Sequence, residues 1–361
     1  MTMNNRIYLD IHAIQTVPPS NINRDDTGSP KTAQYGGTRR ARVSSQSWKK
    51  AMRKYFIDFA EKGKVGKRTL EIVRYVADKI ISLEPEINDE EAMKLAEDIF
   101  KKAKIQTKDQ KAKALFFLGD SQAQALAEAA IQGESDVKKI KEIITNNPAI
   151  DIALFGRMVA DDPSLNEDAS AQVAHSISTH AVQAEFDFYT AVDDFRPEDN
   201  VGAGMLGTIE YNSSTLYRYA NIAVHELKHQ LEDDQAVLST IKLFVEAFIK
   251  SMPTGKINSF ANHTLPQAIL LVLRQDRPVN LVSAFEKPVR SSEGYVDASI
   301  KALFAEADLV KKFVDEPVAQ YVLLINDEAV STEGLALSDN IDDLENRILK
   351  DLEDRLNELE A

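Results

Sequence analysis

One stretch of the sequence has the residue types that bind phosphate groups. Residues 27–57 contain eight Lys or Arg residues and no Asp or Glu, although the whole chain has a formal net charge of −14. Cationic side chains bind nucleic-acid backbones without regard to base sequence, so the window predicts a local anionic partner. Its eight cations are Lys31, Arg39, Arg40, Arg42, Lys49, Lys50, Arg53 and Lys54.

The second half of this window predicts an amphipathic helix from residue 45 to about 61. Either Ser44 or Ser45 can cap its start, because both are short residues with a hydroxyl acceptor. The apolar residues that begin with Trp48 have the spacing of a buried helix face. We therefore expect Trp48 to lie in the core rather than to stack on a base.

Lys49 and Arg53 lie one turn apart on this helix and can bind successive phosphates. The pair 36–37 is Gly-Gly, which would let another backbone pass close by. An alternative is that the lysines only solvate a helix face, but such faces usually alternate cations with acids. The helix start adds polar donors from Ser44, Ser45 and Gln46.

Residues 225–229 read HELKH and match the H-E-x-x-H zinc motif. On a helix, His225 and His229 would share one face, and Glu226 could act as a general base on a zinc-bound water. Glu246 lies at a distance in sequence that allows a third ligand. The alternative, a polar surface turn of a helix, is favoured because the motif follows directly on a strand-like run.

Asp25 and Asp26 form a second candidate for chemistry, because paired carboxylates can bind a metal or supply a general base. Their surroundings are rich in turn-forming residues. Aspartates in such loops more commonly accept hydrogen bonds from turn amides. A metal-dependent nuclease through these two residues stays open as an alternative function.

Residues 202–207 read GAGMLG and match the G-x-G-x-x-G pattern. A dinucleotide site needs a buried strand before the glycines and a helix after them. Here an acidic loop precedes them and a β-rich run follows, so we reject that interpretation. The glycines instead predict a flexible tip of a long hairpin between residues 192 and 207.

The composition excludes several classes of chemistry. There is no cysteine, so disulfides, thiolate nucleophiles and Cys-bound metals are ruled out. The N-terminal residues alternate apolar and polar types, unlike a signal peptide. No run approaches the ~20 apolar residues of a membrane span. We therefore expect a cytoplasmic protein with no membrane contact.

The order of expected elements indicates an α/β protein. Residues 6–16 predict a strand with Ile7, Leu9, Ile11 and Ala13 on one face, and residues 61–146 read as successive helices, which suggests a helical insertion. Beyond Pro148, segments such as DIALFGRMVA, GTIEYN and STLYRYANIAV predict short strands. Later elements are helices near 231–251 and 296–315, strands in AILLVLR and YVLLIN, and an amphipathic C-terminal helix from Asp339 that docks on its own domain.

Several short motifs occur in one order between about residues 6 and 290. They are NRDD (23–26), GGTRRARVSSQSWKKAMR (36–53), DIAL (151–154), GRM (156–158), AH (174–175), TH (179–180), TAVDD (190–194), YRYANI (217–222) and AFEK (284–287). Together they resemble the CasC family, the repeated backbone subunit of the type I-E CRISPR Cascade complex. No single motif would be specific, but the ordered set is.

The resemblance implies a hand-shaped protein. It implies a palm like an RNA-recognition motif, which is a ferredoxin-like fold, with a helical fingers insertion and a β-hairpin thumb. The implied parts are palm with the RNA-binding loop and helix (1–60), fingers (61–146), palm and web strands (147–190), thumb (191–219), second part of the palm (220–335) and C-terminal helix (336–361).

The resemblance also implies a non-catalytic function without cofactor or metal. Copies of the subunit polymerise along the spacer of the guide RNA (crRNA), and the thumb of one copy kinks the strand bound by its neighbour. Implied partners are the crRNA, the target DNA strand, neighbouring copies, and the guide-end cap, small and large subunits of Cascade. Cleavage would belong to a separate recruited enzyme.

Specific residues follow from matching the family motifs to this chain. The family's phosphate contacts match Arg24, Lys31, Ser44, Gln46, Lys49 and Arg53, and Arg39, Arg40 and Arg42 extend the same basic run. Thr38 departs from the pattern, since a lysine is expected there. Met205 and Leu206 are the apolar candidates for kinking the guide strand.

Overall fold

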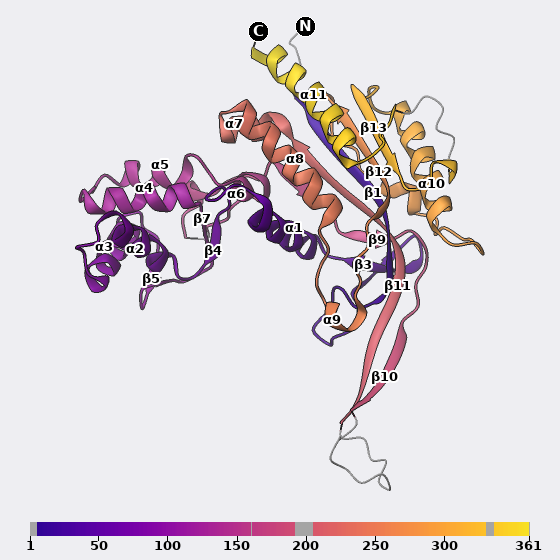
Figure 1. Ribbon diagram of the computed structural model, residues 1–361, viewed down its shortest axis with the longest axis horizontal. Helices are drawn as coiled ribbons and strands as arrows, with labels where there is room; N and C mark the ends of the chain where they lie inside the picture. Colours follow the sequence, from indigo (N-terminus) through magenta and orange to yellow (C-terminus); the bar gives the residue numbers. More distant parts are fainter. Residues whose placement is uncertain (1–5, 160, 192–204, 330–335, 361) are drawn as a thin grey trace.

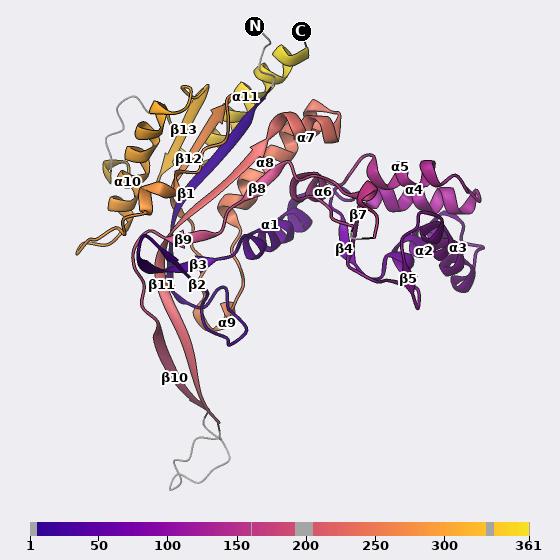
Figure 2. The same ribbon diagram turned by 180° about the vertical axis from the view of Figure 1, so that it is seen from behind.

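The computed structural model describes residues 6–159, 161–191, 205–329 and 336–360. Three parts are visible: a body built on a long sheet, a helical lobe to one side of it, and a two-stranded hairpin that projects from the body (Figures 1 and 2). The basic window lies in the body, close to where all three parts meet.

One sheet forms the framework of the body. Its strand order is β14-β13-β12-β1-β11-β9-β3-β2, and β8 and β10 also pair with β11. The pairs are antiparallel except for β13 with β14. The strands are β1 (Tyr8–Ser20), β2 (Thr32–Tyr35), β3 (Thr38–Val43), β8 (Ala171–Val173), β9 (Ser176–Ser178), β10 (Glu185–Ala191), β11 (Met205–Ala223), β12 (Pro266–Arg274), β13 (Ala319–Leu324) and β14 (Ala336–Leu337).

β1 lies at the centre of the sheet, between β11 and β12. Ile11, for example, pairs with Ala220 on one side and with Leu271 on the other. Leu9, Ile11 and Ala13 are fully buried in one hydrophobic core, which confirms the alternation predicted for this strand. Both faces of β1 are covered, so the first strand of the sequence becomes the axis of the body.

Three segments differ from their predictions. β1 continues to Ser20 instead of ending at residue 16. Its two prolines, Pro18 and Pro19, lie where the pairing of β1 with β11 shifts in register, so they cost no hydrogen bond between the two strands. The two strands expected in 207–223 are one continuous strand, β11. The segment DIALF, expected as a strand, is the helix α6 (Ile150–Phe155); a short, fully buried apolar run does not distinguish helix from strand by its pattern.

Helices cover both faces of the sheet. On one face α1, α8 and α11 share a hydrophobic core with β1, and on the other α10 and η2 share a second core with β12. Leu344, Ile348 and Leu352 of α11 are buried, which confirms that the C-terminal helix docks on its own domain. The elements are α1 (Ser45–Phe59), α7 (Val224–Leu231), α8 (Asp234–Lys250), α10 (Val296–Leu309), α11 (Ile341–Glu360) and the 3-10 helix η2 (Leu281–Phe285).

The helical lobe has its own core between α1 and α6. Val76, Phe100, Leu126 and Ile140 are buried together in it. The insertion is not entirely helical as predicted, because two short strand pairs, β4 with β7 and β5 with β6, join its helices. Its elements are β4 (Lys67–Thr69), α2 (Ile72–Leu83), α3 (Asp89–Lys102), β5 (Thr107–Lys108), β6 (Lys111–Ala112), β7 (Phe116–Leu118), α4 (Asp120–Ile131) and α5 (Val137–Thr145).

The hairpin of β10 and the first part of β11 extends beyond the sheet (Figure 1). The glycine-bearing tip expected between residues 192 and 207 lies mostly outside the described residues. Within the described ranges, no helix is both long and apolar enough to cross a membrane. The mixed α/β fold class predicted from the sequence, with a helical insertion and a long hairpin, is confirmed.

Candidate nucleic-acid interface

The basic window forms one packed unit of a loop, a hairpin and the start of α1. The hairpin pairs β2 with β3 across a turn at Gly36 and Gly37, whose φ angles are 56° and 74°. A Cβ at Gly36 would overlap the carbonyl oxygen of Glu286, so only glycine fits there. The close backbone approach expected at this pair therefore occurs, and its partner is a segment of the same chain.

Ser44 caps α1. Its Oγ accepts the backbone N–H of Ser47 at 3.3 Å, and its own N–H donates to Oδ1 of Asn23 at 2.9 Å. Trp48 is buried in the core and donates its indole N–H to Oγ of Ser176 at 2.9 Å. The helix start is thus tied to the preceding loop, and the hydroxyl of Ser44 is already engaged in capping.

Backbone hydrogen bonds bring the first cations of the window together. The N–H of Lys31 donates to the carbonyl of Asn23 at 2.8 Å, and the carbonyl of Lys31 accepts the N–H of Arg42 at 2.9 Å. Arg24 and Arg39 are exposed. Within the described residues, neither these two arginines nor Lys31 forms an ion pair. Their charges are therefore available to an external anion.

His175 also belongs to this surface. Its Nδ1 lies 3.1 Å from Nη1 of Arg42, and its side chain is exposed. Burial and the positive charges of Arg42 and Lys31 lower the pKa of His175, which favours the neutral ring that accepts from the guanidinium. The sequence spacing between residues 42 and 175 contains no signal for this contact.

Arg40, in contrast, is a core residue. It is fully buried, and burial lowers the pKa of its guanidinium. Arg40 cannot reach a phosphate in this arrangement, because its guanidinium donates to five backbone carbonyls, four of them in distant segments. These are the carbonyls of Tyr35, Ser178, Thr179, Phe285 and Glu286.

Lys49 is half-buried beside an aromatic ring. Its Nζ lies 5.1 Å from the ring centroid of Phe155, and burial lowers the pKa of the ammonium group. No carboxylate of the described residues pairs with it. Gln46, one turn earlier on α1, is exposed. The phosphate contacts predicted for Lys49 and Gln46 stay predictions, and neither side chain is taken up by a carboxylate in the described residues.

Arg53 has a different environment from Lys49, although both were predicted to contact phosphates. Its Nε donates to Oδ2 of Asp151 at 2.9 Å, and Asp151 is completely buried. The guanidinium also donates to the carbonyl of Gly66 and lies 4.6 Å from the ring centroid of Phe117. Arg53 therefore ties α1 to α6 and the helical lobe, with 23% of its side chain exposed.

The first histidine of the HELKH motif contacts the backbone of a neighbouring segment. His225 begins α7, and its Nδ1 lies 3.0 Å from the carbonyl oxygen and 3.2 Å from the amide nitrogen of Ile7. Its ring also packs edge-on against Tyr8. In the part of the chain that the structure describes, no group of three or more His, Cys, Asp or Glu side chains is placed to hold a metal ion.

Asp25 stabilises its own loop. Its Oδ1 accepts from the N–H and hydroxyl of Thr27 and from the N–H of Ser29, and the Thr27 hydroxyl is the main cause of its lowered pKa. Asp26 is exposed. The turn-capping interpretation therefore accounts for Asp25, and the arrangement offers no support for the nuclease alternative.

The thumb candidates lie at the far end of the hairpin. Met205 begins β11 and pairs with Ala191, and residues 192–204 lie outside the described residues. Leu206 pairs with Thr190 and is 61% exposed. An exposed leucine near the end of a projecting hairpin is available for contact with a partner.

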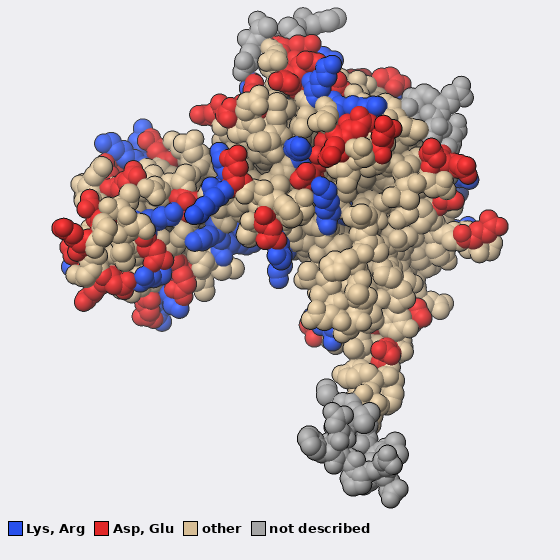
Figure 3. Space-filling view, viewed as in Figure 1, with Lys and Arg blue, Asp and Glu red and all other residues tan. Residues whose placement is uncertain are grey.

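Charge is unevenly distributed over the molecule. In Figure 3, basic side chains gather where the helical lobe meets the body, and acidic side chains cover much of the upper body. The segment from α1 to β4 contributes exposed cations at Lys62, Lys64, Lys67 and Arg68. The junction is therefore the place on this face where positive charge is most concentrated, which favours an anionic strand there.

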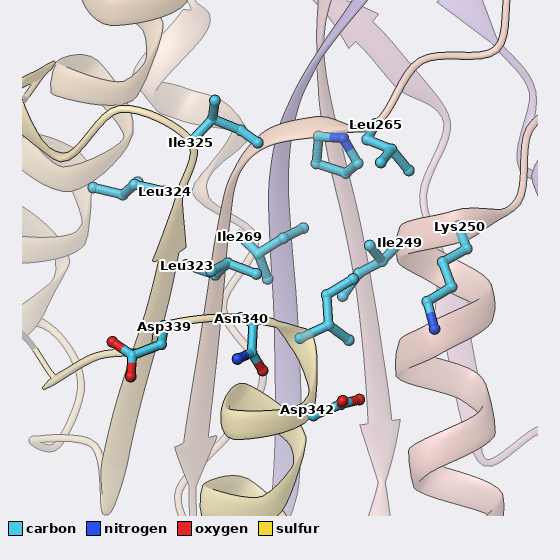
Figure 4. Close-up of a pocket in the computed structure, with 12 residues that line it drawn as sticks. Ile249, Lys250, Leu265, Ile269, Leu323, Leu324, Ile325, Asp339, Asn340 and Asp342 are labelled. Carbon is cyan, nitrogen blue, oxygen red and sulfur yellow. The ribbon is translucent and has the colours of Figure 1, made fainter.

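An apolar groove of about 550 Å³ lies away from the basic window. Figure 4 shows it between the end of α8, β12, β13 and the start of α11, with Ile249, Ile269 and Leu323 among its lining residues. Its lining is mainly aliphatic, and it contains none of the candidate residues. We assign it no chemistry.

Comparisons with known proteins agree with this geometry. The model of the CT1975-like protein family matches residues 9–347. A chain of a CRISPR RNA-guided surveillance complex described as pre-nicking is 30% identical, with 95% of this chain and 99% of that chain covered and a TM-score of 0.84. A chain of another CRISPR RNA-guided surveillance complex is 27% identical, with 96% and 99% covered and a TM-score of 0.65.

No curated protein sequence matches this chain. The family model nevertheless spans most of its length, and the 30% identical chain shares its fold from end to end. On these grounds the protein belongs to the family of CT1975-like proteins.

Proposed function

We propose that this chain is the guide-RNA-binding backbone subunit of a Cascade-type CRISPR surveillance complex. The observation that carries the proposal is the loop, hairpin and helix start of the basic window, whose unpaired cations lie on a chain with a net charge of −14. The similar chains in two CRISPR RNA-guided surveillance complexes support the same function.

The proposed contacts are limited to side chains that have no internal carboxylate partner. Phosphates of the guide are bound by Arg24, Lys31, Arg39, Arg42 and Lys49, with Gln46 as a polar donor. Ser44 and Arg53 hold α1 in place, and Arg40 belongs to the core. Contacts of this kind bind any guide sequence, because phosphates carry no base information.

A subunit that binds guide RNA should contact the RNA backbone and leave the base edges free for Watson–Crick pairing. We therefore propose that target DNA pairs with the bound guide and that the subunit cuts neither strand. Copies of the chain follow one another along the spacer, and the hairpin of each copy, with Met205 and Leu206, reaches the strand held by its neighbour. The ordered motifs support the type I-E assignment and the cap, small and large subunits as further partners.

Co-purification tests this proposal directly. The chain is expressed with a CRISPR array and the neighbouring complex subunits, and the bound nucleic acid is sequenced. We expect discrete guide-length RNA, protected along its spacer. Assembled complex without RNA would overturn the proposal.

A second measurement tests the non-catalytic part. Labelled guide RNA is incubated with the purified chain and Mg²⁺, and its length is followed on a gel. Intact RNA is expected. Cleavage that is lost in the variant D26N, but kept in a matched D58N variant on α1, would instead support the metal-dependent nuclease.

A further inference from the structure

A second stretch without acidic residues packs against the loop of residues 21–31, which leads into the basic window. Residues 251–275 contain no Asp or Glu, although 57 of the 361 residues of the chain are acidic. Their first half forms a loop that contains the short helix α9 (Ile257–Phe260), and residues 253–263 are named the α9 loop below. In both ribbon views the α9 loop lies beside the loop of residues 21–31 (Figures 1 and 2).

The contact between these two loops is close. Gly255 lies against Ile22, and a Cβ at position 255 would overlap the carbonyl oxygen of Ile22. The end of the α9 loop is anchored on β1, because Oγ1 of Thr264 donates to the carbonyl of Thr16 at 2.6 Å and the carbonyl of Thr264 accepts from Nε2 of Gln15 at 2.8 Å. The α9 loop therefore has a defined position relative to the basic window.

The base of the projecting hairpin completes the same unit. Nδ2 of Asn21 donates to the carbonyl of Glu210 on β11 at 2.9 Å. The ring of Tyr211, next along β11, lies 6.0 Å from the ring of Phe260 in α9. The loop of the basic window, the α9 loop and the hairpin base thus meet in one place, although more than 200 residues separate the first two in sequence.

Lys256 is the cation of this second stretch that lies nearest the contact. It follows Gly255 directly, it is partly exposed, and it forms no ion pair within the residues that the structure describes. Its φ angle is 53°, and that of Ala261 at the other end of α9 is 46°. Left-handed conformations cost a non-glycine residue roughly 1–2 kcal/mol, so the surrounding contacts must hold both residues in place.

We propose, building on the function proposed above, that the α9 loop forms a second wall of the guide-RNA site and that Lys256 contacts a phosphate of the strand bound by Arg24 and Lys31. An unpaired lysine in an acid-free segment adds to the local positive potential. Because the α9 loop also contacts the hairpin base, this wall lies where the guide passes from the basic window toward the hairpin.

The test measures binding of labelled single-stranded RNA to the purified full-length chain by fluorescence anisotropy over a series of salt concentrations. We expect K256A and K256N to bind about five- to tenfold more weakly than the parent chain. One lost phosphate contact should also lower the slope of log affinity against log salt by about 0.7. Asn adopts the left-handed conformation more readily than most residues, so K256N tests the charge with little change of backbone.

K301A is the matched control, because Lys301 is an exposed lysine of α10 without an ion pair in the described ranges. It removes the same charge and should leave affinity and slope unchanged. If the parent chain binds RNA and both Lys256 variants have the affinity and salt slope of K301A, then the α9 loop is not part of the RNA site. The proposed function stands in that case. If the parent chain binds no RNA, the proposed function fails and the second wall fails with it.

Discussion

Two lysine- and arginine-rich regions of this protein use their charges differently. In the helical lobe, seven of the fourteen Lys and Arg side chains from β4 to α5 pair with acids; they are Arg74, Lys79, Lys101, Lys111, Lys138, Lys139 and Lys141. In the basic window two of the eight cations, Arg53 and Lys54, form an ion pair within the described residues. Lys31, Arg39 and Lys50 form none there, and neither does Arg24, which precedes the window. The difference teaches that a count of cations alone is a poor guide to an anion site, because acids already neutralise half of the cations in the lobe. The unpaired cations are therefore the ones to test.

Arg53 lies at the border between these two regions, and its loss should have the largest effect. The variant R53A leaves the buried carboxylate of Asp151 without its cation, and breaking such a pair costs about 3 kcal/mol. Urea unfolding of R53A should show this loss. A double variant with D151N should lose less than the sum of the two single losses. If R53A and the parent chain have the same free energy of unfolding, the ion pair with Asp151 does not stabilise the protein, and Arg53 is free to bind an anion as the unpaired cations are.

Lys31 tests the opposite side of the comparison. K31A should leave the unfolding midpoint unchanged, because its ammonium has no internal partner in the described part of the chain. RNA affinity should fall about five- to tenfold, with a loss of about 0.7 in the salt slope, because one phosphate contact is removed. Anisotropy titrations check both values. Equal affinity for the parent chain and K31A would remove Lys31 from the site.

The pH dependence of RNA binding provides a smaller effect through Lys49. Burial lowers the pKa of this ammonium below its usual 10.5, so as pH rises its charge is lost before that of an exposed lysine. RNA affinity should therefore decline at a lower alkaline pH in the parent chain than in K49R, since arginine stays protonated. Matching profiles for the two proteins would show that Lys49 does not contact the strand.

Lys101 should give the smallest effect, because it pairs with Glu97 on the exposed surface of α3. Surface ion pairs of this kind contribute about 0–1 kcal/mol. K101A should change the unfolding free energy by less than about 1 kcal/mol and leave RNA affinity within twofold of the parent chain. A loss as large as that of K31A would extend the nucleic-acid site into the helical lobe.

Local patterns predicted the local elements well. The spacing from Trp48 onward predicted the buried stripe of α1. Apolar residues three or four apart predicted the amphipathic helix α11, which docks on its own domain as expected. Predictions were wrong where a short buried segment had no periodicity of its own, as in α6. They were also wrong for β1 beyond residue 16, where the register shift at two prolines depends on the partner strand.

The sequence by itself determined that an acidic chain contains an acid-free window with a capped amphipathic helix. Composition and local spacing are sufficient for that, because a cap and an apolar stripe involve residues a few positions apart. Only the tertiary structure decided which cations are free. The partners that engage Arg40 and Arg53 include groups 98 to 246 positions away in the chain. Likewise, only the fold brings Gly255 to Ile22, because long-range contacts of this kind leave no local pattern.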